Sequence, residues 1–143
     1  MKRILLISLS LVAVTAFASC DEKMVTYDQL PASAKTFITS YFPEASVSYS
    51  SKDDDLVRPD YEVALSDGTR LEFTNSGELK KVSSRAGIPE AVIPDAIREY
   101  VQFHYPGTGY TEYEVDRRHY EVTLTNRLEL KFNSNFVIVE LDD

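Results

Sequence analysis

The sequence has no tryptophan, only one cysteine in 143 residues, and none of the common catalytic motifs. It contains no glycine-rich nucleotide loop, no H-E-x-x-H, no C-x-x-C and no G-x-S-x-G. The two histidines, His104 and His119, are too far apart in sequence for a two-histidine metal motif. We therefore expect no catalytic residues, no cofactor and no metal site. A pair of glycosidase-type carboxylates stays open, because among 23 acidic residues some pair always lies close in space.

Basic charge is also scarce. The 15 Lys and Arg residues stand against 23 Asp and Glu, which gives a formal net charge of −8. Such a chain repels nucleic acid and anionic lipid headgroups. We therefore expect no nucleic-acid partner, and no membrane contact other than through an attached lipid.

The first 19 residues have the pattern of a secretory signal. Lys2 and Arg3 precede an apolar run, residues 4–18, that is shorter than the roughly 20 residues needed to span a bilayer. Phe17-Ala18-Ser19 then leads to Cys20, and this arrangement resembles a bacterial lipobox, apart from Phe17 where Leu is usual. We predict a lipoprotein signal peptide at 1–19, lipid attachment to Cys20 and a lipidated tether at 20–24. An ordinary signal peptide with a chance cysteine, or an uncleaved anchor, is the alternative.

Lipid attachment at this position predicts the location of the protein. Lasting membrane attachment needs more than one acyl chain, and a bacterial lipoprotein carries several on its one cysteine. We predict an exported protein anchored to the outer membrane, on its periplasmic side or at the cell surface. Asp21 and Glu22 resemble the acidic signals that direct some lipoproteins to the surface, and a solvated tether is the competing interpretation.

The rest of the chain contains one segment twice, LPASAKTFITSYFP at residues 30–43 and IPDAIREYVQFHYP at residues 93–106. Both have apolar residues at i, i+3, i+4 and i+7, which is typical of an amphipathic helix. A proline stands near the start of each helix and another ends it. His104 takes the place of Tyr41, so we expect a half-buried histidine in an aromatic slot rather than a ligand.

Each helical segment is followed by a similar series of short strands. Alternating residues at 61–65, 71–73 and 78–82 surround turns at 67–68 and 75–77, and the pattern returns at 120–124, 130–132 and 136–141. The shorter offset of the second series places a loop at residues 51–55. The last strand, 136–141, is apolar on both faces, so we expect it to be covered on both sides at the junction of the two units.

One such unit buries little by itself, whereas two units side by side share a core and cover each other's sheet edges. We predict an α+β fold made of two tandem helix-plus-four-strand repeats. Residues 25–82 and 88–143 form the repeats, and residues 83–87 form a linker. The repeats make one extended antiparallel sheet with both helices packed on one face.

These features together resemble the PepSY-like family of small exported bacterial proteins, whose fold is similar to that of the β-lactamase inhibitor protein. The resemblance covers residues 25–141: two proline-started helices ending in an aromatic-proline pair, each followed by a Tyr-Glu-Val strand and a hairpin. It contains no catalytic motif. It implies a binding or inhibitory role towards an envelope or extracellular protein or peptide, although a shared fold does not transfer the inhibitor's function.

Aromatic and basic residues are the candidates for binding. Tyr110 and Tyr113 lie in a Gly-bounded segment, where exposed rings on a sheet suit protein binding. The alternative is that they are core residues of a strand. The strongest local positive charge lies at Arg117, Arg118 and His119. One interpretation is an anchor for an acidic partner group, because Arg can bind a carboxylate through two hydrogen bonds. The other is a solvated connection between strands. The predicted function is non-enzymatic binding of a protein or peptide through the sheet face that the helices leave uncovered.

Asp53-Asp54-Asp55 gives a second interpretation, a sensor or carrier lipoprotein for a metal or a small ligand. The D-x-D-x-D-G spacing of a calcium loop is absent, and a solvated loop is the competing interpretation. We expect binding specificity where the two copies differ, at residues 51–55 and 107–119.

Overall fold

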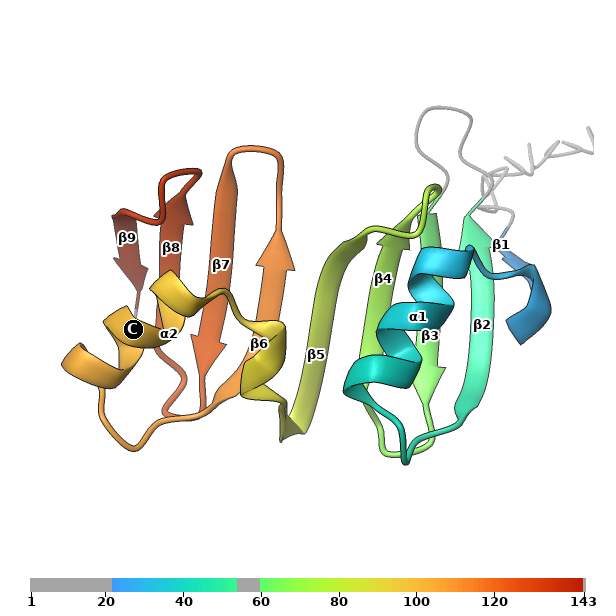
Figure 1. Cartoon of the computed structure of the whole chain (residues 1–143), viewed down its shortest axis with the longest axis horizontal. Coiled ribbons are helices and arrows are strands. Elements are labelled where there is room, and N and C mark those ends of the chain that lie inside the picture. The colour runs from blue at the N-terminus through green and yellow to red at the C-terminus, as the bar shows by residue number, and fades with distance from the viewer. Residues whose placement is uncertain (1–21, 54–59, 143) are drawn as a thin grey trace, which may run out of the picture.

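The computed structural model describes residues 22–53 and 60–142. Within these residues, nine strands form one antiparallel sheet in which the strands follow one another in sequence order (Figure 1). The strands are β1 (Glu22–Met24), β2 (Val47–Asp53), β3 (Asp60–Leu65), β4 (Arg70–Thr74), β5 (Leu79–Ile88), β6 (Tyr110–Val115), β7 (His119–Leu124), β8 (Glu129–Asn133) and β9 (Ile138–Asp142). The helices are η1 (Tyr27–Gln29), α1 (Ala32–Tyr41), η2 (Glu90–Val92) and α2 (Asp95–His104). The predicted α+β class and antiparallel sheet are confirmed.

Both α-helices begin directly after a proline and end at an aromatic residue. Pro31 and Pro94 are the N-cap residues, with φ near −55° and ψ of 145° and 143°. Phe42 and Tyr105 are the C-caps, and their backbone N–H groups donate the last helical hydrogen bonds at 2.8 and 2.7 Å. Helices of 10 residues are marginal in water, so packing on the sheet must stabilise them.

One face of the sheet carries the core. Strand pairing places six buried residues in one row across it, namely Val63, Leu71, Val82, Tyr113, Val122 and Leu130. The ring of Phe37 in α1 meets Phe73 edge-on at 5.7 Å, and Tyr100 in α2 meets Phe132 at 5.4 Å. Phe73 and Phe132 lie two residues beyond members of the row, on the same face. Both α-helices therefore contact this face, as Figure 1 shows.

Three segments differ from their sequence prediction. The predicted linker at 83–87 belongs to β5, because buried residues continue along the strand at Ser84 and Ile88. β2 reaches Asp53, so residues 51–53 of the predicted loop are strand, while 54 and 55 lie outside the described residues. Part of the predicted tether forms β1, an additional strand that pairs with β2.

The C-terminal strand does not lie at the junction of the two halves. In the sheet of the described residues β9 pairs only with β8, and Val139 and Leu141 are 52% and 48% exposed. The prediction that this strand is covered on both faces is wrong, because its apolar side chains lie at an open sheet edge. The halves meet instead through the pair of β5 and β6.

Candidate binding surface

The structure places Tyr110 and Tyr113 in the core. Both belong to β6, and only 2% and 4% of their surfaces are exposed. Burial raises the pKa of both phenols. A shift in strand register between Tyr110 and Glu112 turns both rings towards the helices, although their odd spacing would otherwise place them on opposite faces. The prediction of exposed binding tyrosines is thus corrected, and the alternative of core strand residues describes them.

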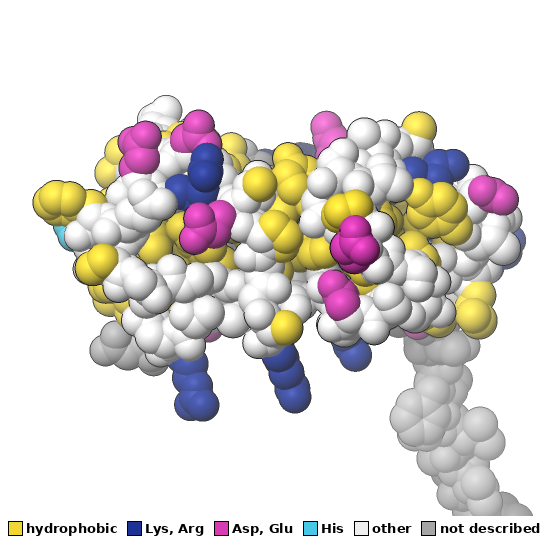
Figure 2. Space-filling view, turned by 60° about the horizontal axis from the view of Figure 1, so that its bottom comes forward, with side chains coloured by type: hydrophobic (Ala, Val, Ile, Leu, Met, Phe, Trp, Pro, Cys, Tyr) yellow, Lys and Arg dark blue, Asp and Glu magenta, His cyan; other side chains and the backbone are white. Residues whose placement is uncertain are grey.

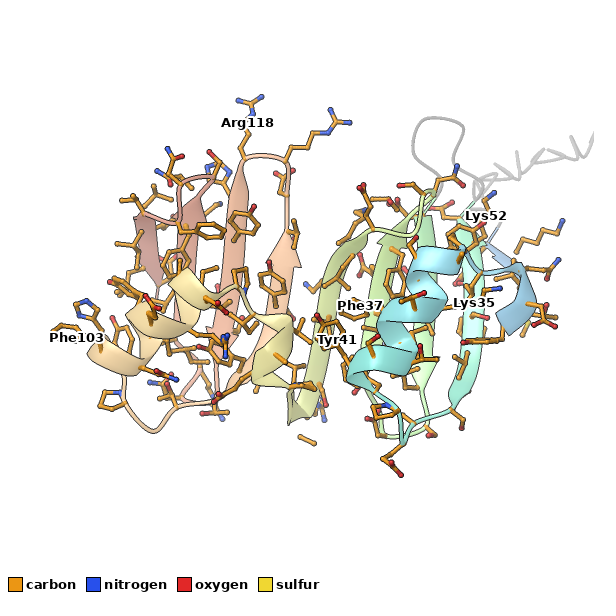
Figure 3. The ribbon with its side chains drawn as sticks, in the orientation of Figure 1. Lys35, Phe37, Tyr41, Lys52, Phe103 and Arg118 are labelled. Atoms are coloured by element: carbon orange, nitrogen blue, oxygen red, sulfur yellow. The ribbon has the colours of Figure 1, made fainter. Side chains whose placement is uncertain are left out.

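Arg117, Arg118 and His119 lie at the connection between β6 and β7. Figure 3 shows Arg118 projecting from this turn away from the sheet. The turn is closed by its own backbone, since Asp116 N–H donates to the His119 carbonyl at 2.9 Å. Arg117 and Arg118 are exposed and His119 is half-buried. Their role as an anchor for an acidic group stays a prediction.

His104 is exposed, so the expectation of a half-buried histidine is wrong. Its imidazole packs on the outside of Tyr100, with ring centroids 4.3 Å apart, and Tyr100 itself covers the sheet. Phe103, which is 81% exposed, points outward from the same end of α2 in Figure 3. His104 thus packs on Tyr100 as Tyr41 packs on Phe37, but it covers that ring from the solvent side.

The opposite face of the sheet carries charged side chains instead of core residues. Strand pairing places one row across it, consisting of Glu62, Glu72, Lys81, Glu114, Glu121, Lys131 and Glu140. These residues alternate with the buried row along each strand, so they point away from the helices. We call this surface the open face. No helix of the described residues lies on it (Figure 1).

Two pairs of carboxylates lie directly opposite one another on the open face, Glu62 with Glu72 and Glu114 with Glu121. Burial raises the pKa of Glu62, and the charge of Glu72 raises it further. Burial and the charge of Glu114 act in the same way on the pKa of Glu121. Because like charges directly across a sheet are destabilising, these pairs reduce the stability of the fold.

Lys81 joins the two halves of the open face. Its Nζ lies 2.7 Å from Glu112 Oε1 and 3.3 Å from Glu114 Oε2, across the pair of β5 and β6. Burial alone would lower the pKa of Lys81, but hydrogen bonds and ion pairs with the two carboxylates outweigh it and raise the pKa. The ion pairs of Lys81 therefore neutralise the junction locally and also reach Glu114, one carboxylate of the second opposed pair.

A hollow of about 1140 Å³ lies on the open face. It is at the end of the sheet that carries the β3–β4 and β7–β8 turns. Its lining includes Arg70, Arg85 and Arg127. Figure 2, in which Lys and Arg have one colour, shows several long basic side chains projecting from the lower side of the molecule in that view. These arginines belong to no motif of the sequence. One signal was available, because Arg127 stands where the first copy has Gly68.

Several predicted features lie outside the described residues, including Cys20, Asp54 and Asp55. Lipid attachment at Cys20 therefore stays a prediction. Within residues 22–53 and 60–142, no helix is long and apolar enough to cross a membrane. The same residues contain no group of three or more His, Cys, Asp or Glu side chains that could hold a metal ion.

A sequence profile of the family described as "Putative beta-lactamase-inhibitor-like, PepSY-like" matches residues 59–140. The chain belongs to this PepSY-like family. Comparison of the PepSY-like chain with the curated proteins gives no match.

Solved structures from Bacteroides are similar to this PepSY-like protein. A DUF2874 family protein of Bacteroides vulgatus is 35% identical, with a TM-score of 0.84 over 87% of this chain and 99% of that one. A "putative calcium-regulated periplasmic protein" of Bacteroides thetaiotaomicron is 34% identical, with a TM-score of 0.83 over 86% and 98%. A second Bacteroides vulgatus protein is 31% identical, with a TM-score of 0.80 over 85% and 99%. All three are described as periplasmic, which supports export of this chain.

Proposed function

We propose that this PepSY-like protein is a non-enzymatic envelope lipoprotein that binds a protein or peptide partner through the open face. The observation that carries the proposal is the pair of opposed carboxylates on each side of Lys81, Glu62 with Glu72 and Glu114 with Glu121. They weaken the isolated fold. A Lys or Arg side chain of a partner placed between the two carboxylates of a pair would remove the repulsion and form charge-assisted hydrogen bonds.

The sheet suits this role because it presents the carboxylates in fixed positions. Neighbouring strands lie about 4.8 Å apart, so the two carboxylate pairs, three strands apart, are separated by about 14 Å. One partner surface can reach both pairs. Binding to a preformed sheet also avoids most of the entropy cost of ordering loops.

We interpret the two halves as copies of one unit whose duplication widens the open face. Phe37 packs on Tyr41 at 4.7 Å in α1, and Tyr100 packs on His104 at 4.3 Å in α2. The C-cap residues of the two helices also have nearly the same backbone angles, with φ of −132° and −135°. Lipid at Cys20 would hold this surface at the outer membrane.

A second function, calcium or small-ligand sensing, is favoured by one observation, the calcium-regulated description of the Bacteroides thetaiotaomicron relative. In this chain its candidate ligands are Asp53, at the end of β2, and the two aspartates that follow. Among the described residues there is no group of three or more His, Cys, Asp or Glu side chains that could hold a metal ion. Binding through the open face is therefore the better supported function.

The test is a pull-down from an envelope extract with residues 20–143 carrying Cys20→Ser. We expect specific partners to be retained, and a double variant Glu62→Lys and Glu121→Lys to lose them. The variant places Lys opposite Glu72 and Glu114, which removes both carboxylate repulsions, but Lys at position 121 also faces Lys131 on β8. Circular dichroism of the variant therefore checks that the loss is not due to unfolding.

The matched control is Glu90→Lys with Glu99→Lys, which makes the same charge change at exposed positions of η2 and α2. It should retain the partners. Recovery of background proteins alone, or equal loss in both double variants, would contradict binding through the open face.

A further inference from the structure

The arginine hollow differs in charge from the rest of the open face. Arg70 comes from β4, Arg85 from β5 and Arg127 from the β7–β8 turn, and all three are exposed. The chain carries 23 acidic residues. Even so, within the described part of the chain none of the three guanidinium groups lies at ion-pair distance from a carboxylate.

Three carboxylates also line the hollow, and one of them, Glu112, is neutralised by an ion pair, whereas Asp67 has, among the described residues, only a neutral hydrogen-bond donor and keeps its charge. Asp67 Oδ1 accepts a hydrogen bond from the Thr69 backbone N–H at 2.9 Å, and Glu112 pairs with Lys81. The third is Glu129. Hydroxyl groups complete the polar lining, from Ser83, Ser84, Thr111, Thr123 and Thr125. None of the described lining residues is aromatic, so the hollow offers no ring on which a sugar or a base could stack.

The backbone of Arg127 is strained. Its φ is +74°, in the left-handed region, whereas the matching turn of the first half has Gly68 at φ +87°. The two turns are closed alike, since Asn126 Oδ1 accepts from Leu128 N–H at 3.1 Å just as Asp67 does from Thr69. Glycine would fit this conformation without strain, and arginine does not. Strained residues cluster at functional sites. Here the strained residue brings a guanidinium group to the hollow, as expected of a residue that serves a site rather than the fold.

We infer that the arginine hollow binds a short acidic segment of the peptide or protein partner, with Asp or Glu side chains gripped by Arg70, Arg85 and Arg127. This inference rests on the proposed function and adds the chemistry of the partner at one end of the open face. The planar guanidinium group binds a carboxylate through two parallel hydrogen bonds, which gives specificity for this ligand. The acidic remainder of the surface repels long polyanions, so a short acidic segment beside basic residues is the complementary partner.

Fluorescence anisotropy with a fluorescein-labelled hexaglutamate peptide tests the inference at low ionic strength, using residues 20–143 with Cys20→Ser. We expect binding of this peptide and none of a hexaglutamine peptide. Arg70→Ala with Arg85→Ala should weaken binding by about tenfold or more, because guanidinium contacts to carboxylates are lost. Arg117→Ala with Arg118→Ala removes the same charge at the opposite end of the strands and should change the affinity less than about twofold.

The variant Arg127→Gly separates a binding role from a structural one. It should raise the thermal midpoint by about 2–5 °C, because the strain is relieved, and at the same time weaken hexaglutamate binding. A lower midpoint, or unchanged affinity, would show that Arg127 serves the fold alone.

Failure of the inference is distinguishable from failure of the proposed function. The hollow is not the acidic-segment site if hexaglutamate does not bind. The same holds if the loss of affinity occurs in the control variant Arg117→Ala with Arg118→Ala. The Glu62 and Glu121 pull-down described above would still decide whether the open face binds a partner.

Discussion

Replacing Gly77 by alanine should separate a specific contact of the fold from a general backbone effect. Gly77 lies in the turn between β4 and β5, at φ +85°. A Cβ added there would lie 2.2 Å from Ser33 Oγ, 2.6 Å from Pro31 Cβ and 3.0 Å from the backbone nitrogen of Ala34. The N-terminus of α1 thus packs directly on this turn, and Ser33 Oγ donates to the Ser76 carbonyl at 2.7 Å.

Three costs add up in the Gly77→Ala variant. The left-handed backbone costs about 1–2 kcal/mol for a residue with a Cβ. The overlap with Pro31 and Ala34 costs about 1–3 kcal/mol, as for an overpacked core. Displacement of Ser33 loses about 1 kcal/mol of hydrogen bonding. We therefore expect a loss of about 3–6 kcal/mol, a large share of the roughly 5–15 kcal/mol that stabilises a domain.

Gly68→Ala is the matched control, because Gly68 has φ +87° but nothing lies within 4 Å of its added Cβ. It should lose only the backbone cost of about 1–2 kcal/mol. Urea unfolding followed by circular dichroism measures both variants. Equal losses in the two would refute the packing of α1 on the β4–β5 turn.

Three further results are expected. Glu62→Gln should raise the free energy of unfolding near neutral pH by roughly 0.2–1 kcal/mol, because repulsion from Glu72 ends. Since the folded state raises the pKa of Glu62, this gain should shrink as the pH falls through the raised pKa and vanish below the ordinary value of 4.5. A gain in urea unfolding that persists in acid would contradict this. Cells producing the full chain should incorporate labelled palmitate, and Cys20→Ala should abolish the label; a persistent label would exclude the lipobox. Millimolar calcium should leave the thermal midpoint unchanged, whereas a rise that Asp53→Asn removes would favour the sensor function.

Local periodicity was sufficient to predict most elements of the fold. The apolar stripes around Ile38 and Val101 predicted both α-helices, because the residues that face the sheet recur with helical spacing. The hairpins were predicted because alternating residues such as Val63 and Leu71 surround turns of the expected type. These signals depend only on near neighbours in the sequence.

Features that depend on register and on long-range position were not predictable in this way. The bulge in β6 that buries Tyr110 and Tyr113 cannot be recognised from the alternation of apolar residues in the sequence. The edge position of β9 depends on the order of strands in the sheet. The arginine hollow joins Arg70 to Arg127 across five strands, so only the three-dimensional arrangement brings these residues together.

Site-specific photo-crosslinking in cells tests the central claim most directly. A photoreactive phenylalanine analogue at Thr123 lies on the open face beside the paired carboxylates, and the same analogue at Gln102 lies on the exposed side of α2. The account predicts a discrete crosslinked product from position 123 and none from position 102. Crosslinks from position 102 alone, or from neither position, would contradict binding through the open face.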